Sequence, residues 1–129
     1  MGTMTDTLSI HAAWVLTVAF ALSLLYELYR ATSKAGTSRH DTMRAFIVQG
    51  VALYGTAAVV ITLLFRGVTG SQWLALGFAV VMILVSIFYY NPQVLPERNP
   101  RMIDWVEDLV FTGLLFVAAT QLAYGVGLA

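Results

Sequence analysis

The chain has 129 residues, enough for one compact domain, and its formal net charge is zero. Hydrophobic residues make up 59% of it and charged residues only 11%, whereas soluble domains carry about 25% charged residues, so the composition excludes a soluble globular protein. The lack of cysteine excludes disulfides and thiol chemistry, and the lack of a basic patch argues against nucleic acid as a partner.

Four long uncharged runs follow one another along the chain, and each can supply the roughly 20 residues that cross a hydrocarbon core. They are continuously apolar rather than alternating, which argues against a β-barrel. We therefore predict an all-α integral membrane protein, one domain over 1–129, in which four transmembrane helices form two consecutive hairpins. The predicted helices lie near 8–29, 44–65, 72–90 and 104–126.

The first predicted helix ends with an acidic residue. The leader before this helix has Asp6 as its only charge, unlike a cleaved signal peptide, so we expect the helix to be kept as an anchor. Glu27 lies about one turn from the helix end, where Arg30 or Arg44 can pair with it. An interfacial ion pair is the favoured interpretation of Glu27. A proton or substrate site is the alternative, because ionisable groups within a membrane are costly and tend to be functional.

Small residues recur at every fourth position on the first and fourth predicted helices. Such residues let helix backbones approach each other in lipid, so we predict that these two helices touch along the stripes. The alternative is that alanine is simply common in membrane helices. The stripes are formed by Ala13, Thr17 and Ala21 and by Ala119, Ala123 and Gly127.

The predicted loops 30–44 and 91–103 hold six of the seven basic residues. Because cytoplasmic loops are enriched in Lys and Arg, we predict that both loops are cytoplasmic and both termini lie outside. The stretch from Glu27 to Arg44 has four basic and two acidic residues, net +2, and that from Glu97 to Asp108 has two basic and four acidic, net −2. The two loops are therefore expected to attract each other, which affects their arrangement more than the stability.

The stretch before the fourth helix has three prolines. Asn91-Pro92 is expected to stop the third helix, because a residue before proline avoids the helical region. Pro96 and Pro100 are expected to keep the link extended and stiff.

Three acidic residues, Asp104, Glu107 and Asp108, share one face of the fourth helix. The favoured interpretation is a helix start, with Asp104 as N-cap and Glu107 three residues later. Alternatively, Asn99 is the cap, in which case Asp104 lies inside the helix and needs another partner. Three carboxylates on one face are also able to bind a cation or pass protons.

Motifs of hydrolases, P-loop proteins and dinucleotide-binding enzymes are absent from the sequence, so we predict no catalytic residue, cofactor or metal, and an enzyme is the less favoured class. The favoured function is a non-catalytic accessory or scaffold subunit of a larger membrane assembly. The alternative is a small homo-oligomeric transporter or channel, coupled to protons or cations, that uses Glu27 or the Asp104, Glu107 and Asp108 cluster.

Either function involves the lipid bilayer, expected to be a prokaryotic cell membrane, and either other membrane subunits or a second copy of the chain. The candidate residues for partner docking or ion handling are charged and lie near the two predicted inner loops. They are Glu27, Arg30, Arg98, Arg101, Asp104, Glu107 and Asp108.

Overall fold

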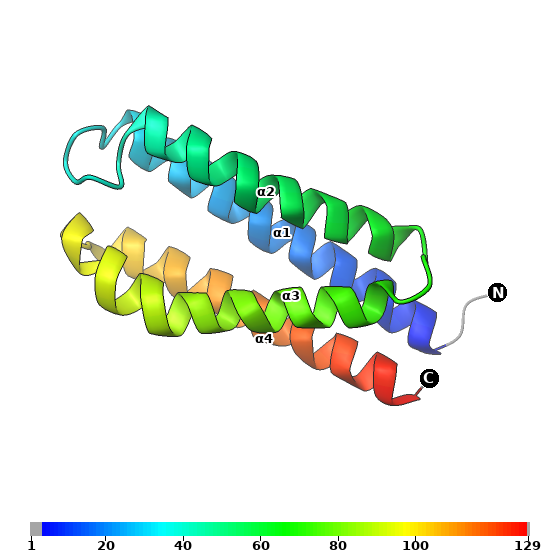
Figure 1. Ribbon diagram of the computed structural model, residues 1–129. Coiled ribbons are helices and arrows are strands. Elements are labelled where there is room, and N and C mark those ends of the chain that lie inside the picture. The colour runs from blue at the N-terminus through cyan, green and yellow to red at the C-terminus, as the bar shows by residue number, and fades with distance from the viewer. Residues whose placement is uncertain (1–3, 129) are drawn as a thin grey trace.

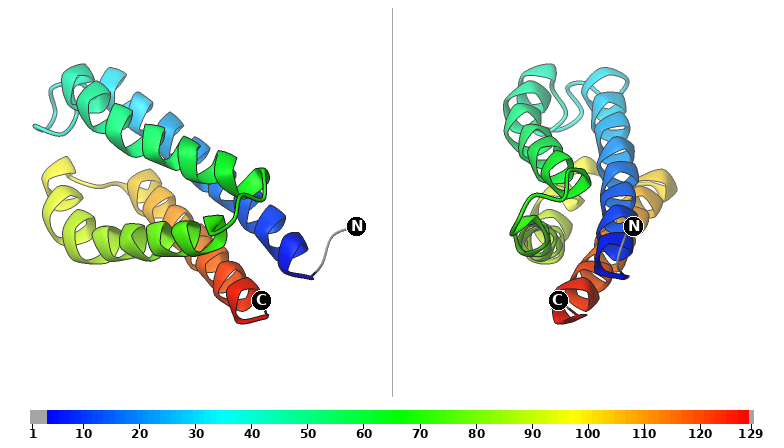
Figure 2. Two further views of the ribbon diagram at one scale, coloured as in Figure 1. Left: turned by 45° about the vertical axis from the view of Figure 1, so that its right-hand side comes forward. Right: turned by 90° about the vertical axis from the view of Figure 1, so that its right-hand side faces the viewer.

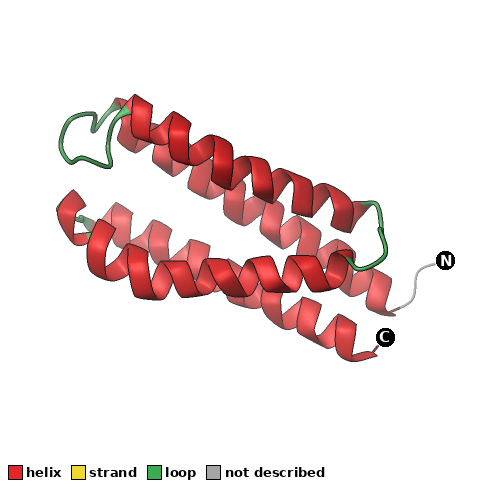
Figure 3. Cartoon of the chain, in the orientation of Figure 1, coloured by secondary structure: helices red, strands yellow, loops and turns green. Residues whose placement is uncertain are grey.

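The computed structural model describes residues 4–128, and all regular structure in that range is helical. The main helices run up and down in an antiparallel bundle (Figure 1) and are joined by short loops (Figure 3). The predicted all-α four-helix fold is thereby confirmed. The helices are α1 (Met4–Thr32), α2 (Met43–Phe65), α3 (Ser71–Val85) and α4 (Met102–Leu128), with the helical turns η1 (Ser86–Val94) and η2 (Pro96–Arg98) between α3 and α4.

The bundle fits a small integral membrane protein, because large apolar side chains such as Leu25, Val51 and Leu109 face outward. Both ends of the described chain lie beside the turn 66–70 (Figure 1). The opposite end of the bundle carries the loop 33–42 and the segment 95–101, and we call it the charged end. Four segments are long and apolar enough to cross a membrane: Asp6–Thr32, Met43–Phe65, Ser71–Val94 and Met102–Gly127.

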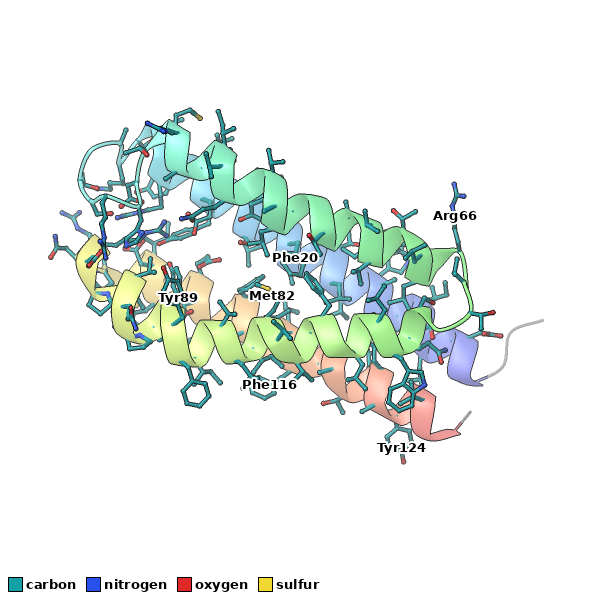
Figure 4. The ribbon with its side chains drawn as sticks, viewed as in Figure 1. Phe20, Arg66, Met82, Tyr89, Phe116 and Tyr124 are labelled. Atoms are coloured by element: carbon teal, nitrogen blue, oxygen red, sulfur yellow. The ribbon has the colours of Figure 1, made fainter. Side chains whose placement is uncertain are left out.

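The core of the bundle receives side chains from all four helices. Phe20 of α1 lies at its centre, with ring centroids 6.4 Å from Tyr54, 5.5 Å from Phe78 and 5.3 Å from Phe111. Lipid is as apolar as leucine, so these contacts stabilise the bundle through close van der Waals packing. Figure 4 shows Phe20 and Met82 pointing into the bundle and Phe116 and Tyr124 pointing away from it.

The helices α1 and α4 form the most extensive helix pair of the bundle. The small residues that were expected between them are not all buried. Ala13 is buried, and Thr17 and Ala119 are half-buried. The other three are exposed: Ala21, Ala123 and Gly127. The stripe on α4 is therefore not its buried face. The buried face of α4 consists instead of Leu115, Ala118, Leu122 and Gly125, and its leucine side chains fill the space inside the bundle.

The third helix does not stop at Asn91, which corrects the sequence-based expectation. From Ser86 to Val94 the turns widen to the π form, and the N–H of Leu95 donates to the carbonyl of Tyr90, five residues earlier, at 2.9 Å. A wider turn gives room to the ring of Pro92, whose missing N–H would interrupt an α-helical ladder. Such π-helical turns within helices occur frequently at functional sites.

The link to α4 is a tight turn rather than an extended segment, a second correction. Pro96 opens the 3₁₀ turn η2, because the fixed φ of proline suits the first position of a helical turn. Asn99 then has a left-handed backbone with a φ of 51°, which asparagine tolerates better than most residues. This reversal turns Arg98 into the bundle, where it is only 5% exposed.

Candidate functional site

Two buried arginines join the two hairpins at the charged end. Arg30 donates to both carboxylate oxygens of Asp41, at 3.0 and 2.6 Å, and to the backbone carbonyl of Arg98 at 3.2 Å. Arg98 donates to the two oxygens of Glu27 at 3.0 and 2.8 Å, and its Nε lies 3.3 Å from Oδ1 of Asp41. We call Glu27, Arg30, Asp41 and Arg98 the clasp.

The partner of Glu27 is therefore Arg98, 71 positions along the chain, and not Arg30 or Arg44 as the sequence suggested. The physical reason is that Arg30 is already held by Asp41. The loops of opposite net charge also meet directly at Glu97. Its carboxylate accepts two hydrogen bonds from Arg39, both at 2.9 Å, and lies 2.7 Å from Nε2 of His40.

Asp104 lies in the first turn of α4, which begins at Met102, so it is not the N-cap. Its Oδ2 accepts a hydrogen bond at 2.8 Å from the backbone N–H of Arg101, the bond that a carboxylate makes at the third helical position in a capping box. Its Oδ1 accepts from the hydroxyl of Tyr26 and lies 3.6 Å from Nη1 of Arg30. Asp104 therefore both starts α4 and ties it to α1.

The electrostatic surroundings keep the clasp charged. Burial opposes ionisation of Asp41, but hydrogen bonds from Arg30 and Ser38 and the charge of Arg98 outweigh it and lower the pKa of this carboxyl below its usual value. Burial likewise opposes the charge of Arg98, but its hydrogen bonds to Glu27 outweigh that effect and raise its pKa. At the surface, the hydrogen bonds from Arg39 lower the pKa of Glu97.

A cavity of about 200 Å³ lies next to the clasp, between α1, α2, the end of α3 with η1, and α4. Its innermost lining residues include the buried Ser23, Ser86 and Phe111, whereas Gln49 and Tyr89 are exposed. The exposed residues mark a mouth between α2 and η1. The helices α2 and α3 meet at the turn 66–70, and α2 diverges from α3 and its continuation η1 toward the charged end (Figures 1 and 2). Tyr89 lies on the side that faces α2 (Figure 4).

Three carboxylates line this cavity, and their environments differ. Glu27 is paired with Arg98. Asp108 is buried, and the Asn91 side-chain amide, assigned from the hydrogen-bond pattern with its nitrogen toward Asp108, donates to both carboxylate oxygens at 2.9 Å. Glu107 is half-buried and has no hydrogen-bond or ion-pair partner within residues 4–128. The three carboxylates of the predicted acidic face therefore have different neighbours. Asp104 contacts Tyr26 and Arg30, whereas Glu107 and Asp108 line the cavity.

Hydroxyl groups and aromatic rings complete the walls. Tyr54 and Ser23 share a hydrogen bond of 2.8 Å, and the hydroxyl of Tyr90 accepts from Arg98 at 3.1 Å. Phe46 and Phe111 add two apolar rings. Within the described residues, no three histidine or acidic side chains converge as a metal site would require. An excess of carboxylates beside aromatic faces is suited to a cation.

Sequence reasoning singled out Glu27, Arg98, Glu107 and Asp108, which the structure brings together around the cavity. Arg101 is exposed and has no ion-pair partner among residues 4–128. The sequence analysis missed two groups. Asp41 was counted only as a loop charge, although it is 0% exposed and holds Arg30. Tyr26 was not singled out, and its spacing of four from Arg30 is the one sequence signal that the two residues share a helix face.

Comparisons with protein family models, with curated proteins and with solved structures find no significant match to this chain. A functional assignment therefore rests on the geometry of the chain itself.

Proposed function

We propose that the chain is a small membrane transporter that binds a cation in the cavity at the charged end. The observation that carries the proposal is the carboxylate of Glu107, which lines a cavity within the bundle and has no partner among residues 4–128. A carboxylate removed from water costs several kcal/mol, on the order of 3 or more, unless a counter-charge or a proton compensates it. A cation from outside the chain supplies that counter-charge.

In this proposal the carboxylates have separate roles. Glu107 is the primary binding group, because a proton and the cation compete for it, and this competition couples the two fluxes. Glu27 is the second group, and its arginine partner Arg98 must yield if the cation is to approach it. Asp108 accepts from the amide of Asn91 and adds a second carboxylate to the cavity that no arginine pairs with.

The same proposal gives the molecule an orientation. The excess of arginine and lysine in the loops of the charged end supports a cytoplasmic position for that end in a prokaryotic cell membrane, with both termini outside. The mouth between α2 and η1 then opens at the level of the inner leaflet.

The test is proton flux in liposomes that contain the purified chain and a pH-sensitive dye. Addition of Na⁺, K⁺ or an organic ammonium ion should release protons from the wild-type vesicles, and Glu107→Gln should reduce the rate at least tenfold. Arg101→Gln is the matched control, because it removes an exposed charge at the same end of the bundle but outside the cavity. A wild-type chain that moves no ion, or a Glu107→Gln variant that transports normally, would overturn the proposal.

A second function, an accessory subunit or a homo-oligomer, has its own support. Three small residues expected to mediate helix contacts, Ala21, Ala123 and Gly127, are exposed on the bundle surface. Exposed small residues allow a further helix to approach closely in lipid. Purification in mild detergent separates the two possibilities: other subunits in fixed stoichiometry support the accessory function, and a chain active in liposomes on its own excludes it.

A further inference from the structure

The cavity walls distinguish between kinds of cation. Inorganic cations such as Ca²⁺ take six to eight oxygen ligands that converge on one point. Among the described residues, no three acidic or histidine side chains converge on one point in that way. The cavity instead combines Glu107 and Asp108 with the rings of Phe46, Tyr54 and Phe111. Aromatic faces attract organic ammonium ions, because the ring quadrupole presents its negative face to the cation.

The size of the cavity limits the ligand. A cavity of about 150 Å³ in another protein accommodates benzene. The volume here is about 200 Å³, which leaves room for one ring and a few further heavy atoms. A ligand with several aromatic rings does not fit without movement of the helices.

The mouth of the cavity favours an amphipathic ligand. Its exposed rim carries the amide of Gln49, the ring of Tyr89 and the apolar Val85, all on membrane-spanning helices. Arg98, the last residue of the turn η2, lines the cavity and is buried and held by Glu27. A ligand that reaches the mouth therefore meets an apolar and aromatic rim first and the carboxylates afterwards.

We infer that the ligand is an organic ammonium ion with a single aromatic ring or an alkyl group of similar size, bound with its cationic group at Glu107 and its apolar group between α2 and η1. This inference rests on the proposed transport function and narrows its substrate class.

Glycines on α2 offer a test that changes no charge. Gly50 lines the cavity, and a Cβ there would meet the ring of Tyr54, another lining residue, at 3.4 Å. Gly55 lies on the same helix with no atom within 4 Å of its Cβ position. Gly50→Leu should therefore fill the cavity, whereas Gly55→Leu makes the same chemical change toward open space.

The experiment is calorimetric titration of the purified full chain in detergent with benzyltrimethylammonium, whose charge does not depend on pH. Saturable binding to the wild type is expected, weakened at least tenfold in Gly50→Leu and in Glu107→Gln and unchanged in Gly55→Leu. Tetraphenylphosphonium, a cation with four rings, should bind at least tenfold more weakly than benzyltrimethylammonium. Melting temperatures of the three variants establish that each is folded.

Several outcomes would overturn the inference. They are an absence of benzyltrimethylammonium binding, equal binding by wild type and Gly50→Leu, and tetraphenylphosphonium binding as tight as that of the smaller cation. If liposomes still show Glu107-dependent flux of Na⁺, K⁺ or protons while benzyltrimethylammonium fails to bind, the substrate class is wrong and the transport function stands. If both flux and binding are absent, both proposals fall.

Discussion

Replacement of Arg98 by glutamine should strongly destabilise the charged end. The guanidinium is 5% exposed in the folded chain and makes two hydrogen bonds to Glu27 and one to the hydroxyl of Tyr90. Glutamine keeps part of the volume but removes the charge, which leaves the carboxylate of Glu27 beside the cavity without its counter-charge. Removal of one member of a buried ion pair costs about 3–5 kcal/mol. Asp41 loses its weaker contact but keeps Arg30, so its contribution to the loss is small.

A double-mutant cycle tests whether this loss comes from the pair itself. Glu27→Gln alone leaves Arg98 buried with Asp41 as its only carboxylate, so it is also expected to destabilise the fold. The double variant leaves neither an unpaired Glu27 nor an unpaired Arg98. Its loss of stability should therefore be smaller than the sum of the losses in the two single variants. The coupling free energy between contacting charged residues is about 0.5–3 kcal/mol.

The measurement is the free energy of unfolding in mixed micelles of a mild detergent and dodecyl sulfate, followed by far-UV circular dichroism. Arg39→Gln is the control, because Arg39 also pairs with a carboxylate of the other loop but is 75% exposed, and no measurable change is expected. Equal effects of Arg98→Gln and Arg39→Gln, or additive losses in the cycle, would show that the buried pair does not hold the two hairpins together.

Three further predictions test other parts of the structure. Ala118→Leu should destabilise the bundle by about 1–3 kcal/mol, because Ala118 is buried and a larger side chain overpacks the core. Ala123→Leu, on the exposed face of α4, should leave the free energy of unfolding unchanged. Equal effects of the two substitutions would mean that α4 is rotated. Gly70→Ala should cost about 1–2 kcal/mol, because Gly70 has a φ of +83° before α3, whereas Gly77→Ala, inside the helix with open space around it, should be neutral or stabilising in the same assay. The pKa of Asp41 is lower in the folded chain than in the unfolded chain. The ionised carboxylate therefore stabilises the fold at any pH above the unfolded-state pKa of about 3.9, and this stabilisation is lost as the pH falls through the folded-state pKa. Stability should therefore decline in acid below about pH 4, and a decline equally steep in Asp41→Asn would contradict this assignment.

The four spans and their order could be predicted from the sequence because a hydrocarbon core requires long uncharged runs, and the charges that end those runs also mark the helix ends. The rotation of α4 about its axis could not be predicted from the sequence. In lipid, both small and large apolar residues suit a helix contact and a lipid-facing surface, so the pattern of Ala119, Ala123 and Gly127 did not distinguish the two faces. Leu115 and Leu122 occupy the buried face instead.

The charged residues around the cavity could be identified from the sequence, but not their pairing. The contact between Arg98 and Glu27 depends on a 3₁₀ turn followed by a left-handed Asn99, and single dihedral angles of this kind have no periodic signal. The cavity depends on the divergence of α2 and η1 and on the π-helical passage through Pro92. The sequence indicated a stop at that proline, because the residue before proline usually leaves the helical region.

The sequence separations within the clasp set an order of events during synthesis of the chain. Asp41 can bind Arg30 as soon as the first hairpin exists, because only 11 positions separate them. Glu27 has to wait for Arg98, 71 positions later, and Tyr26 for Asp104, 78 positions later. A nascent chain that has inserted only α1 and α2 therefore has half of its clasp, and the carboxylate of Glu27 is neutralised only when the ribosome has delivered Arg98 in η2.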